Sequence, residues 1–425
     1  MVRGFVISAP RSGEGKTLLT LGILRLLTQR GLKVQPFKVG PDYIDTKWQA
    51  VAAGRPSYNL DLFSMGEGRI KALFYHKSKD CDYSVVEGVM GLFDGRYSTF
   101  KLAGLLGLPI ILVLDTSGVA ETIFYILKGL AERIKKAGLD LLLFLNRVSS
   151  HRHLLRLERT LKGYQIIGHL FRKRELELPS RHLGLYLPEH MKEAEDLISK
   201  IAYELEKSID LSVFKPIPKP PEEAPLPRFF PDLPFQRIAI ALDPAFNFYY
   251  QHILEEISQK LEPLFFSPLE DSGLPTSAQG LYLGGGYPEL FARRLSENKG
   301  MLKEIRAFAE ADLPIYAECG GLVYLSKGLF WEDNFYPLAG IFPFEVSKKG
   351  LALGYRRVKL LARHPFFQGL KEFYAHEFHY TQIENTANLE KIYKVYTPEH
   401  GNFYEGFCYK NVLASYLHFI AVKEN

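Results

Sequence analysis

The sequence is poor in cysteine and has no long uninterrupted apolar run. Its 425 residues include only three cysteines, Cys81, Cys319 and Cys408. An odd number of thiols without metal-ligand spacing excludes a disulfide framework and indicates a reducing compartment. The longest apolar stretch, 102–114, is interrupted by Pro109 and is shorter than the roughly 20 residues of a membrane span. The N-terminus also lacks the apolar core of a signal peptide. We therefore expect a cytoplasmic protein with no membrane partner.

An excess of charge of one sign is also missing. Lys and Arg number 53 and Asp and Glu 48, which leaves a net charge of +5. No block of basic residues is long enough to form a nucleic-acid arm, so we expect no nucleic-acid partner. Apolar residues make up 47% of the chain. At about 150 residues per domain, this length predicts two or three globular domains.

The clearest break in the sequence is a proline-rich segment at residues 213–235. It contains eight prolines within 22 residues, and proline removes the backbone donors that helices and central strands need. We interpret it as a linker between domains at 1–212 and 236–425. On both sides, apolar runs alternate with helix-like segments, which predicts α/β domains with parallel sheets. The expected strands are 4–8, 34–39, 83–86, 110–114, 141–145, 165–168, 237–242, 263–266, 280–283 and 314–317, followed by a strand-rich end.

Residues 8–17 read SAPRSGEGKT and lie between an expected strand and an expected helix. A glycine-rich turn at this place directs backbone N–H groups and the helix N-terminus toward an anion. The pattern predicts an ATP site in which Lys16 reaches the β- and γ-phosphates and Thr17 ligates Mg²⁺. Pro10 stands where the usual pattern has its first glycine, and a tight turn with a surface lysine is the alternative. The candidate loop residues are Ser12, Gly13, Gly15, Lys16 and Thr17.

Two further strand ends supply charged residues. The segment FKVGPDYIDT contains Lys38, Asp42 and Asp45, and VVEGVMGLFDG contains Glu87 and Asp94. Ligands of open parallel sheets collect at the carboxyl ends of the strands, and Mg²⁺ takes oxygen ligands. We predict Asp45 and Glu87 as metal ligands, and Lys38, Asp42 and Asp94 as residues that position substrate or phosphate. For each aspartate, capping of a turn is an equal alternative.

Three further residues are candidates for the nucleotide site. Asn146 ends the apolar run LLLFLN and can present its amide to an adenine edge or cap the strand. Arg181 and His182 lie in a turn that can approach the nucleotide.

The second domain contains the pattern of a thiol nucleophile. In PIYAECGGLVYL, Cys319 stands between an apolar strand and a helix-like run, with glycines directly behind it. This is the pattern of a nucleophile elbow, and a buried apolar cysteine is the alternative. The turn LYLGGGYPE can add oxyanion donors, so we predict Gly285, Gly286 and Gly320 in that role. His418, at the end of an expected strand in NVLASYLHFIA, is the predicted base, with a core histidine as the alternative.

His376 and His379 lie in YAHEFHY, where alternating aromatic residues predict a strand. Their spacing differs from that of a zinc helix. We expect them to pack or to line a substrate-facing edge rather than to bind metal.

Taken in this order, the motifs resemble those of the cobyrinate a,c-diamide synthase family, over nearly the whole chain. The resemblance rests on APRSGEGKT, FKVGPDYID, VEGVMGLFDG, LPSRHLGLYLP, LYLGGGYPEL, PIYAECGGLVYL and AHEFHY. It implies a P-loop synthetase domain similar to dethiobiotin synthetase, followed by a class I type glutamine amidotransferase domain. It also implies that Lys16 and Thr17 bind phosphate and Mg²⁺ and that Cys319 and His418 are nucleophile and base. One departure is that the family often ends in Y-L-H-x-H-F, whereas this chain has YLHFIA.

The resemblance further implies an activity. The expected reaction is the amidation of the a and c acetate carboxylates of cobyrinate, with ATP, Mg²⁺ and glutamine, through an acyl phosphate. The expected partners are glutamine and a tetrapyrrole polycarboxylate, and a homodimer is a further expectation. Hydrogenobyrinate and nickel-sirohydrochlorin a,c-diamide synthases share these motifs and stay open as alternatives. A nucleotide-switched binding protein of the chromosome-partitioning kind, with an inert second domain, is the alternative from another class.

Overall fold

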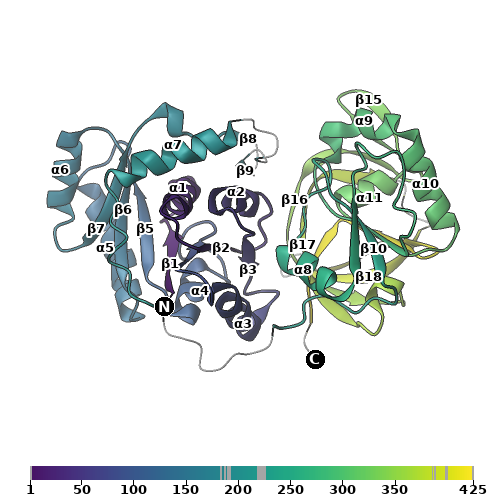
Figure 1. Ribbon diagram of the computed structural model, residues 1–425, viewed down its shortest axis with the longest axis horizontal. Coiled ribbons are helices and arrows are strands. Elements are labelled where there is room, and N and C mark those ends of the chain that lie inside the picture. Colours follow the sequence, from purple (N-terminus) through teal and green to yellow (C-terminus); the bar gives the residue numbers. More distant parts are fainter. Residues whose placement is uncertain are drawn as a thin grey trace. The chain divides into compact units, whose positions relative to one another are not determined.

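The computed structural model describes residues 2–181, 184, 185, 188, 193–217, 226–384, 386, 389–397 and 401–423. The chain divides into two compact units, Met1–Pro227 and Arg228–Asn425 (Figure 1). Each unit has its own sheet and its own apolar core. His182 and the side chain of Arg181, which the sequence places near a nucleotide, lie outside the described part of the chain.

The first unit contains a seven-stranded sheet in which all neighbours pair in parallel, in the order β3-β2-β4-β1-β5-β6-β7. Strands of such a sheet are buried on both faces, which explains why they appear in the sequence as continuous apolar runs. The six strands predicted for this unit are confirmed, and β3 is the strand that the sequence did not indicate. The strands are β1 (Arg3–Ser8), β2 (Val34–Val39), β3 (Tyr58–Leu60), β4 (Tyr83–Glu87), β5 (Ile110–Asp115), β6 (Leu141–Val148) and β7 (Gln165–Phe171).

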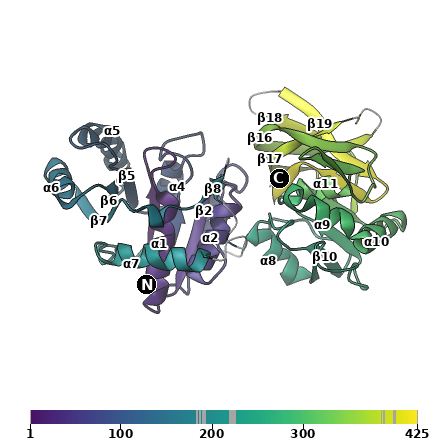
Figure 2. The same ribbon diagram turned by 90° about the horizontal axis from the view of Figure 1, so that it is seen from above.

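Helices connect these strands and cover both faces of the sheet (Figures 1 and 2). On one face α1, α2 and α7 contact one another, and α3 contacts α4 on the other. The helices are α1 (Lys16–Gln29), α2 (Ile44–Ala53), α3 (Gly66–Ser78), α4 (Thr99–Leu106), α5 (Thr122–Lys136), α6 (His151–Thr160) and α7 (Ala194–Glu206). A short antiparallel pair, β8 (Ser180–Arg181) and β9 (Gly184–Leu185), precedes α7.

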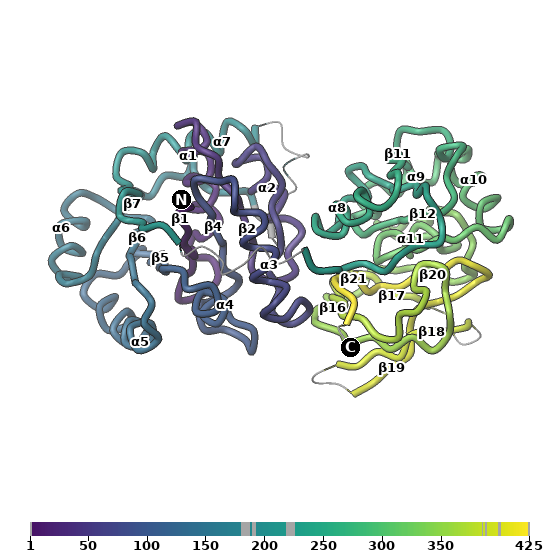
Figure 3. Tube along the Cα trace, turned by 60° about the horizontal axis from the view of Figure 1, so that its bottom comes forward, coloured from purple at the N-terminus to yellow at the C-terminus, as the bar shows by residue number. Residues whose placement is uncertain are grey.

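The second unit contains a twelve-stranded mixed sheet. Figure 3 traces the path of the chain through this unit. Its first part is parallel, in the order β11-β10-β12-β13-β20, and contains the four strands that the sequence predicted there. The predicted four are β10 (Arg237–Ala241), β11 (Glu262–Phe266), β12 (Gly280–Leu283) and β13 (Ile315–Glu318), and the fifth strand of this part is β20 (Val412–Ser415). The remaining pairs are antiparallel except β14 with β16. They involve β14 (Gly328–Trp331), β15 (Asn334–Pro337), β16 (Glu345–Leu360), β17 (Glu372–Glu384), β18 (Glu390–Thr397), β19 (Gly401–Tyr409) and β21 (Leu417–Val422).

The strand expected to end at His418 is in fact two strands, so that prediction was wrong. The break falls at Tyr416, between β20, which pairs with β13, and β21, which pairs with β17. A buried carboxylate from β19 causes the break: Glu405 accepts hydrogen bonds from Ser415 Oγ at 2.6 Å and from the Tyr416 N–H at 2.7 Å. His418 is therefore the second residue of β21 rather than the last of a strand.

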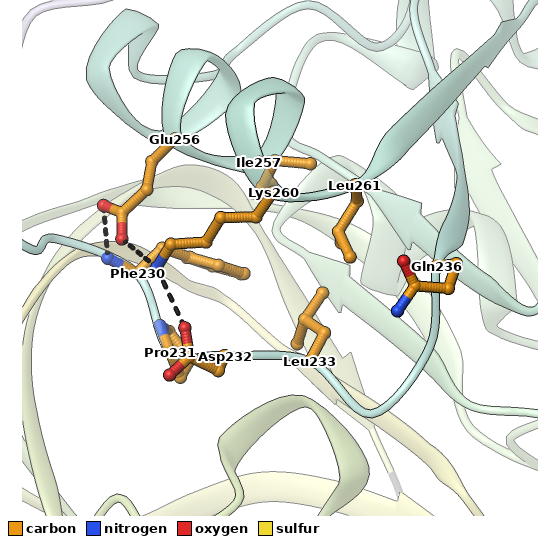
Figure 4. Close-up of a pocket in the computed structure, with 9 residues that line it drawn as sticks. All are labelled: Phe230, Pro231, Asp232, Leu233, Gln236, Glu256, Ile257, Lys260 and Leu261. Atoms are coloured by element: carbon orange, nitrogen blue, oxygen red, sulfur yellow. Dashed lines mark hydrogen bonds and ion pairs between the residues drawn. The ribbon is translucent and has the colours of Figure 1, made fainter.

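The α-helices in the described part of the second unit are α8 (Gln251–Lys260), α9 (Ala292–Glu297), α10 (Lys299–Glu310) and α11 (Gly320–Leu325). The end of the proline-rich segment packs against α8, where the N–H groups of Phe229 and Phe230 donate to Glu256. Figure 4 shows the contact of Phe230. A hollow forms beside this contact, and Lys260 there pairs with Asp232 at 2.9 Å and with Glu256 at 2.8 Å. Because the charges of the hollow pair with one another, it is a packing feature rather than a candidate site. In the part of the chain that the structure describes, no helix has the length and apolarity of a membrane span.

The contact between α1 and α7 leaves no room for a side chain at Gly22. A Cβ atom there would lie 2.8 Å from Ile201 Cγ2 and 3.0 Å from Leu205 Cδ2. We predict that Gly22→Ala lowers the free energy of unfolding by about 1–3 kcal/mol, because an overpacked helix contact outweighs the gain in helix propensity. The measurement is urea denaturation followed by the fluorescence of Trp48, which is buried in α2, in a Trp331→Phe background.

The matched control is Gly104→Ala in α4. A Cβ atom at Gly104 would meet no atom within 4 Å, so the exchange should stabilise the unit by about 0.5–1 kcal/mol. Equal effects of the two substitutions would contradict the packing described for α1 and α7.

Candidate functional sites

The first site lies where the loop after β1 meets the start of α1. Gly15 has a left-handed backbone with φ of 100°, which positions Lys16 as the first residue of the helix. The Lys16 ammonium folds back over the loop and donates to the carbonyl of Arg11 at 3.3 Å. Burial, together with the charge of Lys38, lowers the pKa of Lys16. The loop thus forms a closed turn around its lysine, with Ser12 and Gly13 exposed at its tip.

A buried ammonium group lies beside this loop. Lys38, on β2, has its Nζ 2.5 Å from Asp45 Oδ2 and 2.9 Å from Glu87 Oε1, and it donates to the carbonyl of Gly88 at 3.2 Å. Burial alone would lower the pKa of Lys38, but the Asp45 and Glu87 carboxylates outweigh it and raise the pKa. Lys38 therefore stays charged and links β2, α2 and β4 at the carboxyl ends of the two strands.

Glu87, the last residue of β4, bonds to side chains from α1, β2 and α2. Its Oε1 also accepts the Thr17 hydroxyl at 2.6 Å, and its Oε2 accepts the Gln49 amide at 2.7 Å. Burial raises the pKa of Glu87 and Lys38 opposes that shift. The structure thus brings Thr17, Lys38, Asp45 and Glu87 together, although they come from three separate segments of the sequence.

The oxygen donors of this cluster fit Mg²⁺. They are the Thr17 hydroxyl and the carboxylates of Asp45 and Glu87, all hard ligands. Within the described residues, no three His, Cys, Asp or Glu side chains form a metal cage. Mg²⁺ commonly takes one or two carboxylates and completes its shell with phosphate oxygens and water, so this donor set suits a metal that arrives with a nucleotide.

Two predicted positioning residues hold the backbone in turns. Asp42 Oδ1 accepts the N–H groups of Ile44 at 2.9 Å and Asp45 at 2.8 Å, and so starts α2. Burial and the Asp45 charge raise the pKa of Asp42 to about 7. Asp94 Oδ2 accepts the Gly91 N–H at 2.7 Å, within a loop that bonds to the phosphate loop through Leu92 N–H and the Ala9 carbonyl.

Asn146 also faces the phosphate loop. Its amide nitrogen donates to the carbonyl of Glu14 at 2.8 Å, and its oxygen accepts the N–H of Arg147. Sequence reasoning missed the neighbouring ion pair between Arg147 and Asp115, at 2.6 Å, and the bond from Arg147 to the Gly13 carbonyl at 3.1 Å. Single charged residues at strand ends form no recognisable motif, so no signal in the sequence indicated this contact.

The second site is built around Cys319, between β13 and α11. Its φ is 47°, a left-handed value that costs energy in a residue other than glycine and that occurs at nucleophile elbows. The Cys319 N–H donates to the Ser415 carbonyl at 2.7 Å, and the thiol lies 3.4 Å from the Phe378 carbonyl. Burial, and then the charge of Glu289, raises the pKa of the thiol. A base is therefore needed to generate the thiolate.

His418 lies close to this elbow. Ser415, which bonds to Cys319, precedes it by three residues, and Glu318, the neighbour of Cys319, has Oε2 3.7 Å from His418 Nδ1. The imidazole is fully buried. A Cβ atom on Gly285 would overlap its ring, so only glycine fits at that position. The predicted base and one predicted oxyanion donor therefore meet beside the cysteine.

The other predicted oxyanion glycines meet in the same place. A Cβ atom on Gly320 would lie 3.1 Å from the nitrogen of Gly286, and the Gly321 N–H donates to the Gly284 carbonyl at 3.0 Å. Gly286 has φ of 155°. The glycine turn after β12 and the turn at Cys319 therefore interlock through main-chain atoms.

The two histidines of β17 lie at this site without forming a metal group among the described residues. His376 is the register partner of His418, and burial followed by the charge of His418 lowers its pKa to about 3. His379 bonds to Glu377 at 2.9 Å and stacks on the ring of Tyr416 with centroids 3.7 Å apart. The prediction of a strand is confirmed. Glu318, Glu377 and its ion-pair partner Arg356 were missed, because charged residues in strands look like ordinary polar positions.

Residues 5–185 match the CobQ/CobB/MinD/ParA nucleotide binding domain, and residues 237–425 match the CobB/CobQ-like glutamine amidotransferase domain. The chain is 40% identical to the cobyrinate a,c-diamide synthase of Caldanaerobacter subterraneus, over 98% of this chain and 95% of the relative. The chain belongs to the cobyrinate a,c-diamide synthase family.

Further relatives with the same name support this membership. The protein of Synechocystis sp. is 37% identical over 97% of this chain and 89% of the relative, and that of Picrophilus torridus is 37% identical over 98% and 95%. The chain is thus an enzyme, a glutamine-hydrolysing carbon–nitrogen ligase with a nucleotide-binding domain. This assignment disfavours the nucleotide-switched binding protein with an inert second domain.

The buried ion pairs of the first site lead to a stability prediction. Lys38→Met should lower the free energy of unfolding by about 3–5 kcal/mol, because it leaves the Asp45 and Glu87 carboxylates buried without their cation. Urea denaturation followed by Trp48 fluorescence, again in the Trp331→Phe background, measures the effect.

Arg30→Met is the control for this substitution. Arg30 pairs with Glu206 at 3.0 Å, and both side chains are about half exposed to solvent, so the loss should stay below about 1 kcal/mol. If Lys38→Met costs no more than Arg30→Met, the buried ammonium does not hold the cluster together.

Proposed function

We propose that this enzyme amidates the a and c acetate carboxylates of cobyrinate, with glutamine as nitrogen donor and ATP as activator. The observation that supports it most directly is the meeting of Cys319, His418 and the glycine turns in a chain that also contains a phosphate loop. The substrate comes from the relatives, which share 37–40% of their residues with the chain over nearly its full length and are named cobyrinate a,c-diamide synthase.

Glutamine hydrolysis is the task of the second unit. In the proposed reaction, Cys319 Sγ attacks the side-chain carboxamide while His418 takes the thiol proton. The N–H groups of Gly285, Gly286 and Gly320 hold the oxyanion of the tetrahedral intermediate. His418 returns the proton to the leaving nitrogen, which departs as ammonia, and water then hydrolyses the thioester to glutamate. A raised thiol pKa makes this proton transfer necessary.

Activation of the carboxylate is the task of the first unit. A carboxylate does not react with ammonia in water because its leaving group would be oxide, so transfer of the γ-phosphoryl group of ATP must first make an acyl phosphate. Lys16 and the N–H groups of Ser12, Gly13 and Gly15 bind the phosphates in this proposal. Asn146 faces the adenine. Lys38, Asp42 and Asp94 position substrate or phosphate.

Thr17, Asp45 and Glu87 would hold Mg²⁺, which when bound neutralises charge on the triphosphate. Glu87 already orients the Thr17 hydroxyl at 2.6 Å. Ammonia is mostly protonated in neutral water and is then no nucleophile, so the reaction benefits from release of the nitrogen away from bulk water.

Cys319→Ala should abolish amidation with glutamine and leave amidation with ammonium salts intact, because the thiol is needed only to liberate nitrogen. Product formation is measured with each nitrogen source at saturating ATP. Cys408→Ala, at a partly exposed thiol of the same unit, is the control and should retain both activities. If Cys319→Ala loses both, the division of labour between the two units is wrong.

The tetrapyrrole is tested by competition between related substrates. Cobyrinate, hydrogenobyrinate and nickel-sirohydrochlorin are offered in parallel with ATP, Mg²⁺ and glutamine, and product masses are followed over time. We expect cobyrinate to gain two amides fastest. Faster double amidation of either of the others would replace cobyrinate as the substrate.

A further inference from the structure

A buried glutamate lies next to the imidazole of the proposed base. Glu318 ends β13 directly before Cys319, and only 2% of its surface is exposed. Its Oε2 is 3.7 Å from His418 Nδ1, and its Oε1 accepts the Phe419 N–H at 2.9 Å. One carboxylate is therefore linked both to the ring of His418 and to the backbone that follows it.

The strands around Glu318 fix its position. Tyr316 precedes it by two residues on β13 and so shares its face of the sheet, and Tyr282 is the register partner of Tyr316 on β12. Their rings stack with centroids 5.4 Å apart. Burial raises the pKa of both hydroxyls, and the Glu318 charge raises it further. The side chain of Glu318 thus lies beside the stacked rings of Tyr316 and Tyr282 and next to the proposed base.

Three other groups of the described chain that lie near His418 carry no charge. His376, its partner on β17, is buried and its pKa is lowered to about 3, so it is neutral at ordinary pH. The ring of Phe248 lies with its centroid 6.5 Å from that of His418, and Gly285 contributes main chain. Glu318 is therefore suited to stabilise the positive charge that appears on His418 when the thiol proton is transferred.

We propose that Glu318 is a positioning residue for glutamine hydrolysis, whose carboxylate accepts the Nδ1–H of His418 and so presents Nε2 to Cys319. This inference rests on the proposed roles of Cys319 and His418. A neutral imidazole carries one proton, and the group that binds one ring nitrogen decides which nitrogen is free to act as base. The contact shortens when the imidazole becomes charged, as charge-assisted hydrogen bonds do.

A purely structural role is the competing explanation, because Glu318 also binds the Phe419 N–H. Glu318→Gln separates the two. The amide oxygen of glutamine can still accept the Phe419 N–H, but the side chain has lost its charge and its NH₂ group cannot accept a proton from Nδ1. A structural role predicts normal catalysis in this variant, whereas a positioning role predicts a loss.

The experiment measures steady-state glutamine hydrolysis and ammonia-supported amidation in the full-length enzyme. For Glu318→Gln we expect kcat for glutamine hydrolysis to fall by about 100-fold, with KM for glutamine and ammonia-supported amidation unchanged. Glu318→Asp, which restores a carboxylate with shorter reach, should recover part of kcat. Glu256→Gln is the matched control, because Glu256 of the same unit also accepts main-chain N–H groups and should keep the wild-type kcat.

The outcomes separate this inference from the proposed function. A wild-type kcat in Glu318→Gln, with an active wild type, overturns the positioning role alone. Loss of all glutamine hydrolysis in the wild type itself would contradict the proposed function.

A second measurement on the wild-type enzyme does not depend on the folding of any variant. ¹⁵N-histidine spectra, with His418 assigned from its missing signals in His418→Gln, show which ring nitrogen is protonated. A proton on Nδ1 supports the positioning role, and a proton on Nε2 overturns it.

Discussion

The amidotransferase site depends on one main-chain hydrogen bond, from the Cys319 N–H to the Ser415 carbonyl. It closes the parallel pairing of β13 with β20, in which Glu318 and Ser415 are register partners. The chain then turns at Tyr416 and continues as β21, on which His418 lies, so this bond fixes the end of the strand that directly precedes the proposed base. The residue that donates this bond also has a positive φ, a value that costs energy in a residue other than glycine.

The break between β20 and β21 shows how a distant residue shapes the site. Glu405 of β19 binds both Ser415 and Tyr416, and this contact separates the two strands. Burial raises the pKa of Glu405 to about 7, and its hydrogen bonds to Ser415 and Tyr416 oppose that shift. Two buried glutamates therefore contact the Ser415–His418 segment. Glu405 binds its backbone and the Ser415 hydroxyl, and Glu318 faces the imidazole of His418.

In the first unit, a buried cation holds the residues of the candidate site together. Lys38 pairs with both Asp45 and Glu87, whose burial without a cation would be costly. Through Glu87 the cluster also reaches Thr17, at the start of the helix after the phosphate loop. The oxygen atoms of Thr17, Asp45 and Glu87 that make these stabilising contacts are thus the same ones that would hold Mg²⁺ in the proposed reaction.

The sequence allowed most of the parallel strands of the two units to be predicted, because burial on two faces leaves continuous apolar runs such as Ile110–Asp115. The two candidate sites could be predicted because each is marked by a glycine-rich turn directly after a strand, which is a short pattern of consecutive residues. The short strand β3 and the break at Tyr416 could not be predicted, since the first is only three residues long and the second depends on Glu405 from another strand. Glu318 and Arg147 were missed because their partners become neighbours only in the folded chain.

The central claim is that the main chain holds Cys319 beside His418 as the nucleophile for glutamine. A diazoketone analogue of glutamine, which alkylates the thiol that would attack the carboxamide, tests it on the full-length enzyme. Peptide mass spectrometry then identifies which of the three cysteines is modified. The account predicts modification of Cys319 alone, prevented by excess glutamine and lost in His418→Gln. Equal modification of Cys81 or Cys408, or labelling that glutamine does not prevent, would contradict it.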